Sequence, residues 1–199
     1  MEKRLMVAIT GQSGCGKSTL SAYYSSKGYK VIDCDKVAKD IRSFPECQQQ
    51  LAEYFGADII FDGQVDTKLL SMRAFASEEK LQMLTDITHP FIEAEILRQA
   101  DDAFAKGDKI VFVDGAVIIG HRVEKHCNKF IVVVVEFEKQ CARLMKRDNI
   151  TFEQAQTRVL KQTPYSDMLK KADYVINNNT DVQNLILQGE LVIRQLEAL

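Results

Sequence analysis

The sequence predicts an α/β fold with a five-stranded parallel sheet flanked by helices, on the strength of three observations. Five short apolar, β-branched runs are typical of strands buried on both faces. They alternate with segments of helical apolar spacing, as in parallel α/β sheets. The first run leads directly into a glycine-rich motif of the kind that binds phosphate. The predicted strands are residues 5–9, 30–32, 110–113, 130–135 and 174–176.

The predicted helices lie between and after these strands. They cover residues 18–26, 46–55, 90–105, 139–147, 152–162 and 182–196. Two regions, about 36–107 and 143–171, carry helices without a strand of the same kind and are interpreted as helical insertions over the sheet. The first has a turn signal at Asp62-Gly63, a helix start at 77–79 and a second start at His89-Pro90. The second has a capping-box pattern from Thr151 to Gln154.

Length and composition indicate one domain with small appendages. A chain of 199 residues with 46% apolar content can bury one core, which we assign to about 1–35, 108–142 and 172–199. A net charge of −2, without a basic block, argues against a nucleic-acid partner. Five scattered cysteines, an odd number, indicate reduced thiols and a cytoplasmic protein. Residues 5–9 form too short a run for a leader or a membrane span, so no membrane partner is expected, and the oligomeric state stays open.

The phosphate-binding motif follows the first predicted strand and opens the first predicted helix, as a P-loop requires. Its residues match G-x-x-x-x-G-K-[ST]: Gly11, Gln12, Ser13, Gly14, Cys15, Gly16, Lys17 and Ser18, followed by Thr19. Backbone N–H groups and the positive helix end stabilise phosphate, and Lys17 is expected at the β- and γ-phosphates. The Ser18 hydroxyl would bind Mg²⁺. For Thr19, packing of the first helical turn is the alternative to ATP contact.

The remaining motifs favour a compact kinase among P-loop proteins. A switch GTPase needs an NKxD motif, and the segment starting at Asn128-Lys129 lacks the Asp. Phosphoryl transfer needs an acceptor-side carboxylate and cations that neutralise the transferring group. Asp35 follows the second strand and is either a proton acceptor or the N-cap of a helix starting at Lys36. Asp114 ends the third strand, where it either holds Mg²⁺ through water, lines the acceptor pocket or simply caps the strand.

Arginines are expected to close over the phosphates. Arg143 and Arg147 are four residues apart and therefore share one helix face, with Arg158 further along the same insertion. A solvated basic face is the competing interpretation.

The order and spacing of these motifs resemble the dephospho-coenzyme A kinase family across nearly the whole chain. The segments that carry the resemblance are residues 11–18, 31–35, 62–66, 89–90, 113–114, 147–148 and 172–178. The resemblance implies a nucleoside-monophosphate-kinase-like core, a CoA-binding insertion at about 36–107 and an arginine-bearing lid at about 143–171. It further implies ATP-dependent phosphorylation of the ribose 3′-hydroxyl of dephospho-CoA, the last step of coenzyme A biosynthesis, with ATP and Mg²⁺ as cofactors.

The resemblance also assigns roles to individual residues. Asp35 would be the catalytic base, acting with Lys17 and the lid residue Arg143. Arg147 and Asn178 would bind ATP, with Asn178 beside the adenine. His89 would lie on the acceptor side, with a helix-start or core role as the alternative.

One departure from the family pattern keeps other functions open. After Asp114, residues 116–120 lack the Pro and the acidic residue of many members. A related nucleoside or metabolite kinase with another acceptor is therefore the second hypothesis. A nucleotide-binding regulatory protein that transfers no phosphate is the third.

Overall fold

The computed structural model describes residues 4–199, which form two compact units. One unit comprises the chain up to Ile32 together with Ala100–Leu199. The other comprises Asp33–Gln99.

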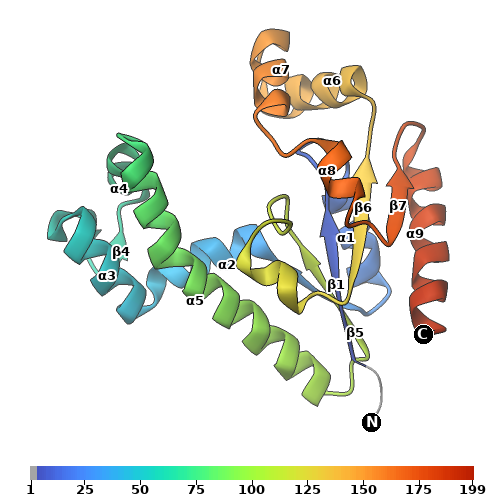
Figure 1. Cartoon of the computed structure of the whole chain (residues 1–199), viewed down its shortest axis with the longest axis horizontal. Coiled ribbons are helices and arrows are strands. Elements are labelled where there is room, and N and C mark those ends of the chain that lie inside the picture. Colours follow the sequence, from blue (N-terminus) through green and yellow to red (C-terminus); the bar gives the residue numbers. More distant parts are fainter. Residues whose placement is uncertain (1–3) are drawn as a thin grey trace. The chain divides into compact units, whose positions relative to one another are not determined.

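The first unit is built on a five-stranded sheet in the order β2-β5-β1-β6-β7 (Figure 1). Its strands are β1 (Leu5–Thr10), β2 (Lys30–Asp33), β5 (Ile110–Asp114), β6 (Lys129–Val134) and β7 (Tyr174–Asn177). The pairings of β1 with β5, β1 with β6 and β6 with β7 are parallel. The five apolar runs therefore predicted the strands correctly, and the α/β fold is confirmed.

The centre of the sheet is also the centre of the core. Every residue of β1 is buried, as expected for a strand with neighbours on both sides and helices on both faces. The Phe112 ring of β5 stacks on Tyr24 with 4.3 Å between the ring centroids. Because β1 is fixed on both edges and both faces, the loop that follows it starts from a rigid position.

Helices complete the first unit, as Figure 1 shows. They are α1 (Lys17–Ser26), α6 (Phe137–Asp148), α7 (Phe152–Leu160), α8 (Tyr165–Leu169) and α9 (Val182–Glu197). Helix α9 packs against α1 and β7. The predicted capping box is confirmed, because the Thr151 hydroxyl accepts from Gln154 N–H and the Gln154 side chain accepts from Thr151 N–H. The short helix α8 was not predicted.

The second unit is mainly helical and differs from the prediction in several elements. It contains α2 (Cys34–Asp40), α3 (Pro45–Phe55), α4 (Thr67–Ala74) and most of α5 (Glu78–Ala105). A two-stranded antiparallel hairpin, β3 (Ile60–Phe61) and β4 (Gln64–Val65), encloses the predicted Asp62-Gly63 turn. Neither the hairpin nor α4 was predicted.

The predicted helix start at His89-Pro90 is wrong. Helix α5 runs through both residues for 28 residues, with Pro90 inside it. Proline removes the N–H that would bond the Asp86 carbonyl. Pro90 and Asp86 are both exposed, so water can reach the freed carbonyl, and the helix continues.

No helix in the described range 4–199 is both long enough and apolar enough to span a membrane.

Candidate active site

The phosphate-binding motif forms the turn between β1 and α1. Gly11, Gly14 and Gly16 have φ angles of 145°, 84° and 106°, a region that other residues rarely adopt. A Cβ atom on Gly11 would overlap the Val133 carbonyl oxygen, and one on Gly16 would overlap the Asn178 side chain. The loop therefore packs so closely on its neighbours that only glycine fits at these two positions.

The first turn of α1 offers positive charge and free hydroxyl groups. Helix α1 begins at Lys17 with no acidic residue in its first turn and no side-chain cap. Lys17 Nζ donates to the carbonyl oxygens of Gly11 at 2.7 Å and Gln12 at 3.4 Å, so the ammonium group is held against the loop. Ser18 is exposed, whereas Thr19 is half-buried. A helix N-terminus of this kind stabilises phosphate through its dipole and its N–H groups.

The Cys15 thiol fills space inside the loop. The residue is fully buried, and this burial raises the pKa of the thiol, although the nearby Lys17 charge opposes the shift. The thiol therefore stays protonated at neutral pH and does not act as a nucleophile.

Asp114 lies beside the helix that follows the loop. It pairs with Ile9 across β5 and β1, and its Oδ2 accepts from Ser21 Oγ at 2.7 Å. Ser18 and Ser21 are three residues apart on α1 and therefore share one helix face. The structure thus brings the Asp114 carboxylate to the face of α1 that carries Ser18.

Asn178 holds the loop rather than pointing into solvent. Its side chain is 5% exposed, and Nδ2 donates to the Cys15 carbonyl oxygen at 2.7 Å. Its own carbonyl oxygen accepts from Arg143 of α6 at 2.9 Å. The predicted lid residue Arg143 and the predicted ATP-site residue Asn178 therefore meet beside the loop, while a contact of Asn178 with adenine stays a prediction.

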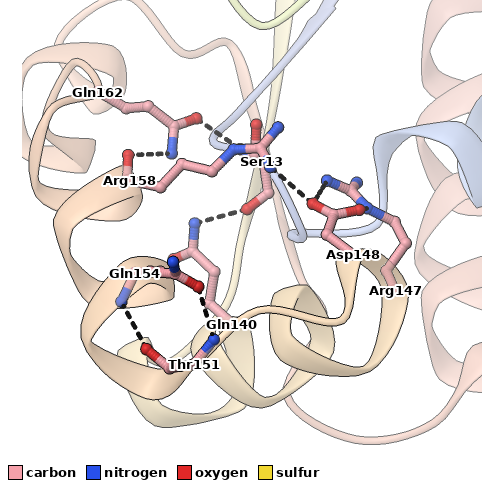
Figure 2. A network of polar contacts seen from close by, with 8 residues as sticks. All are labelled: Ser13, Gln140, Arg147, Asp148, Thr151, Gln154, Arg158 and Gln162. Atoms are coloured by element: carbon pink, nitrogen blue, oxygen red, sulfur yellow. Dashed lines mark hydrogen bonds and ion pairs between the residues drawn. The ribbon is translucent and has the colours of Figure 1, made fainter.

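Gln140 also contacts the loop, and sequence reasoning missed it. Its Nε2 donates to the Ser13 carbonyl oxygen at 2.8 Å, and the residue is 1% exposed (Figure 2). The spacing of Gln140 from the apolar residues of its helix could have indicated this contact. Gln140 lies four residues before Leu144 and so occupies the apolar face of an amphipathic helix. A polar residue on that face needs a hydrogen-bond partner, and the loop provides it.

The segment after α7 bonds to the other side of the loop. Ser13 N–H donates to Gln162 Oε1 at 2.7 Å, and Gln162 Nε2 donates to the Arg158 carbonyl oxygen at 3.1 Å (Figure 2). Gln12 Nε2 donates to the Thr163 carbonyl oxygen at 3.0 Å. The predicted lid region is therefore hydrogen-bonded to the phosphate-binding loop.

Two arginines of that region share one carboxylate (Figure 2). Arg147 bonds both oxygens of Asp148, at 2.7 and 2.8 Å, and Arg158 bonds Oδ2 at 2.6 Å. The Arg147 guanidinium, with a smaller contribution from Arg158, holds the pKa of the Asp148 carboxyl below its ordinary value. Asp148 thus ties the end of α6 to α7.

Asp148→Asn will lower the free energy of unfolding by a small amount at neutral pH, because it removes the charge that both arginines contact. The folded-state pKa is depressed, so the ion pairs stabilise the protein above the unfolded pKa, about 3.9, and this contribution is lost as the pH falls through the folded value. Urea unfolding of both proteins at neutral pH and below pH 3 measures the difference. A difference that persists unchanged in acid would contradict this assignment.

Comparisons with known proteins identify the family of the chain. A family model of dephospho-CoA kinases matches residues 5–184. A dephospho-CoA kinase of Fusobacterium nucleatum is 34% identical over 187 residues, covering 94% of this chain and 95% of the relative. The chain belongs to the dephospho-CoA kinase family. Its members are ATP-using phosphotransferases, so the protein is an enzyme of that class.

Solved structures support the same fold. The dephospho-CoA kinase of Campylobacter jejuni superimposes with a TM-score of 0.74 at 26% identity, over 96% of both chains. The protein TT1252 of Thermus thermophilus superimposes with a TM-score of 0.80 at 24% identity, over 98% of both chains. The P-loop kinase fold therefore extends over nearly the whole described chain.

Two residues that the dephospho-CoA kinase resemblance singled out lie in the second unit. Asp35 is exposed in the first turn of α2, and His89 is half-buried in the middle of α5. The N-cap of α2 is Asp33, whose Oδ1 accepts from Asp35 N–H at 2.8 Å and Lys36 N–H at 3.0 Å. The alternative that Asp35 is the N-cap is therefore wrong, as is a helix-start role for His89. Their roles in catalysis and acceptor binding stay predictions.

Proposed function

We propose that the protein transfers the γ-phosphate of ATP to the ribose 3′-hydroxyl of dephospho-CoA, giving CoA and ADP. The observation that supports this proposal most is a complete phosphate-binding loop within a chain that matches the dephospho-CoA kinase family over residues 5–184. The relatives that share this match act on dephospho-CoA by name.

The loop side of the reaction requires that charge on the transferring group be neutralised. Lys17 Nζ is already held against the loop and would move onto the β- and γ-phosphates with little reorganisation. Arg143 and Arg147 are the further cations that we assign to the phosphates. Each has a partner in the structure, Asn178 and Asp148, from which it would exchange to phosphate.

Oxygen ligands at the loop fit Mg²⁺. Within residues 4–199, no cluster of three or more His, Cys, Asp or Glu side chains could hold a metal ion, so the phosphates of ATP would complete the site. The Ser18 hydroxyl would be the direct protein ligand, with Asp114 holding coordinated water or lining the acceptor pocket. When bound, the ion offsets the charge of the β- and γ-phosphates.

Asp35 is the base that we assign to the 3′-hydroxyl. It follows β2 of the parallel sheet, and its carboxylate is exposed and free of the capping role, which Asp33 fills. A carboxylate so placed would accept the proton of the attacking hydroxyl or orient it. We assign His89 to the acceptor side and Asn178 to the adenine side on the family pattern.

Incubation with ATP and Mg²⁺ will give CoA with dephospho-CoA as acceptor and no product with adenosine or without acceptor. ADP release and the mass of the product measure this. Phosphorylation of a different hydroxyl would favour the related-kinase hypothesis. Tight ATP binding without ADP formation on any acceptor would favour the regulatory hypothesis.

A further inference from the structure

Two buried carboxamides hold the phosphate-binding loop from outside. Gln140 Nε2 donates to the Ser13 carbonyl oxygen at 2.8 Å, and Asn178 Nδ2 donates to the Cys15 carbonyl oxygen at 2.7 Å. The two residues are 1% and 5% exposed. They come from α6 and from the position after β7, so two separate elements hydrogen-bond to alternate carbonyl groups of one short loop.

Each of these hydrogen bonds fixes the direction in which the next backbone N–H group points. In a trans peptide unit the carbonyl group and the following N–H group point in opposite directions. Holding the Ser13 carbonyl toward Gln140 therefore turns Gly14 N–H away from it, and holding the Cys15 carbonyl toward Asn178 does the same for Gly16 N–H. Among the residues that the structure describes, neither N–H group donates to a protein acceptor. Both are available to an anion.

These hydrogen bonds are needed because the glycines of the loop let each peptide unit adopt the opposite orientation at little cost in free energy. A flip of either peptide unit would change φ of the glycine that follows, and glycine adopts both signs of φ readily. Gly14 and Gly16 have φ angles of 84° and 106°. After a flip, the carbonyl oxygen would face the phosphates and repel them. The carboxamide N–H groups of Gln140 and Asn178 hold the two carbonyl oxygens away from the phosphates and so oppose this flip.

We propose that Gln140 and Asn178 are positioning residues that point the N–H groups of Gly14 and Gly16 into the anion site and so set its affinity for phosphate. The inference rests on the proposed use of this loop for ATP and gives Asn178 a second role, in addition to the proposed contact with adenine. Arg143, one turn from Gln140 on α6, donates a hydrogen bond to the Asn178 carbonyl oxygen and so connects the helix of Gln140 with Asn178.

Gln140→Met will weaken binding of inorganic tripolyphosphate by roughly tenfold and leave adenosine binding unchanged, and Asn178→Leu will weaken tripolyphosphate binding by a similar factor. Each variant keeps the size of the side chain but cannot donate to the loop carbonyl. Calorimetric titration with tripolyphosphate and with adenosine separates the two effects. Gln156→Met is the matched control, since Gln156 is half-buried on α7 and its side chain makes no hydrogen bond within the described chain. It should bind both probes normally.

Equal losses for tripolyphosphate and adenosine in Gln140→Met, or no loss for tripolyphosphate in either variant, would overturn the inference. A test without variants uses the unaltered protein, in which the amide NMR signals of Gly14 and Gly16 should shift on adding tripolyphosphate. Stationary signals, or no binding of tripolyphosphate, would also overturn it. These measurements contain no acceptor, so failure to make CoA would count against the proposed function alone.

Discussion

Lys17→Ala will fold normally and lose at least about 10²-fold in kcat, because it removes a charge aimed at the transferring phosphoryl group. Lys17 is half-buried in the first turn of α1 and forms no ion pair in the described chain, so its removal leaves no buried charge unpaired. The rate of CoA formation at saturating ATP and dephospho-CoA measures the effect.

Lys27→Ala is the control at the other end of the same helix. Lys27 caps the C-terminus of α1, and its Nζ lies 5.3 Å from the centre of the Tyr23 ring. Removing it changes the net charge by the same amount as Lys17→Ala without touching the loop, so kcat should stay near normal. Near-normal turnover in Lys17→Ala itself would reject the loop as the phosphate site.

The sheet and the loop were predictable because each depends on local pattern. A strand buried on both faces must be apolar at nearly every position, and β1 is buried throughout. The motif from Gly11 to Ser18 has a fixed spacing, since its glycines must adopt positive φ and its lysine must follow them. Both constraints act within a few residues of the chain.

The wrong predictions of helix starts and caps concern exposed positions, where water can satisfy backbone groups that a buried position would leave without a hydrogen bond. The sequence predicts a helix start at Pro90, yet α5 continues through it because Pro90 and Asp86 are exposed. Likewise Asp33 and Asp35 flank the same helix start, and sequence alone does not distinguish which side chain folds back on the N–H groups. The structure assigns this cap to Asp33.

The glutamines around the loop could not be assigned because their partners are distant in sequence. Gln140 and Gln162 bond Ser13 from 127 and 149 residues away. No motif specifies such contacts, and a glutamine on an amphipathic helix ordinarily faces water. Only the buried-face position of Gln140 hinted at a partner, without naming it.

Asp35→Asn will leave stability nearly unchanged and lower kcat by about 10²- to 10⁴-fold, the range for loss of a general base. Asparagine keeps the shape of the side chain but does not accept a proton at neutral pH. Because Asp33 caps α2, the substitution removes no hydrogen bond that holds the helix start. The measurement is kcat and KM for dephospho-CoA, together with the unfolding midpoint.

Asp33→Ala supplies the contrasting result on the same turn. It should destabilise the protein by about 1 kcal/mol through loss of the cap, while Asp33→Asn should preserve the cap and the stability. If Asp35→Asn retains turnover, then Asp35 does not act as the base, and the carboxylate that accepts the proton must be sought elsewhere. If it loses turnover while its unfolding midpoint matches that of the unaltered protein, the loss is chemical, because the cap that could explain it structurally belongs to Asp33.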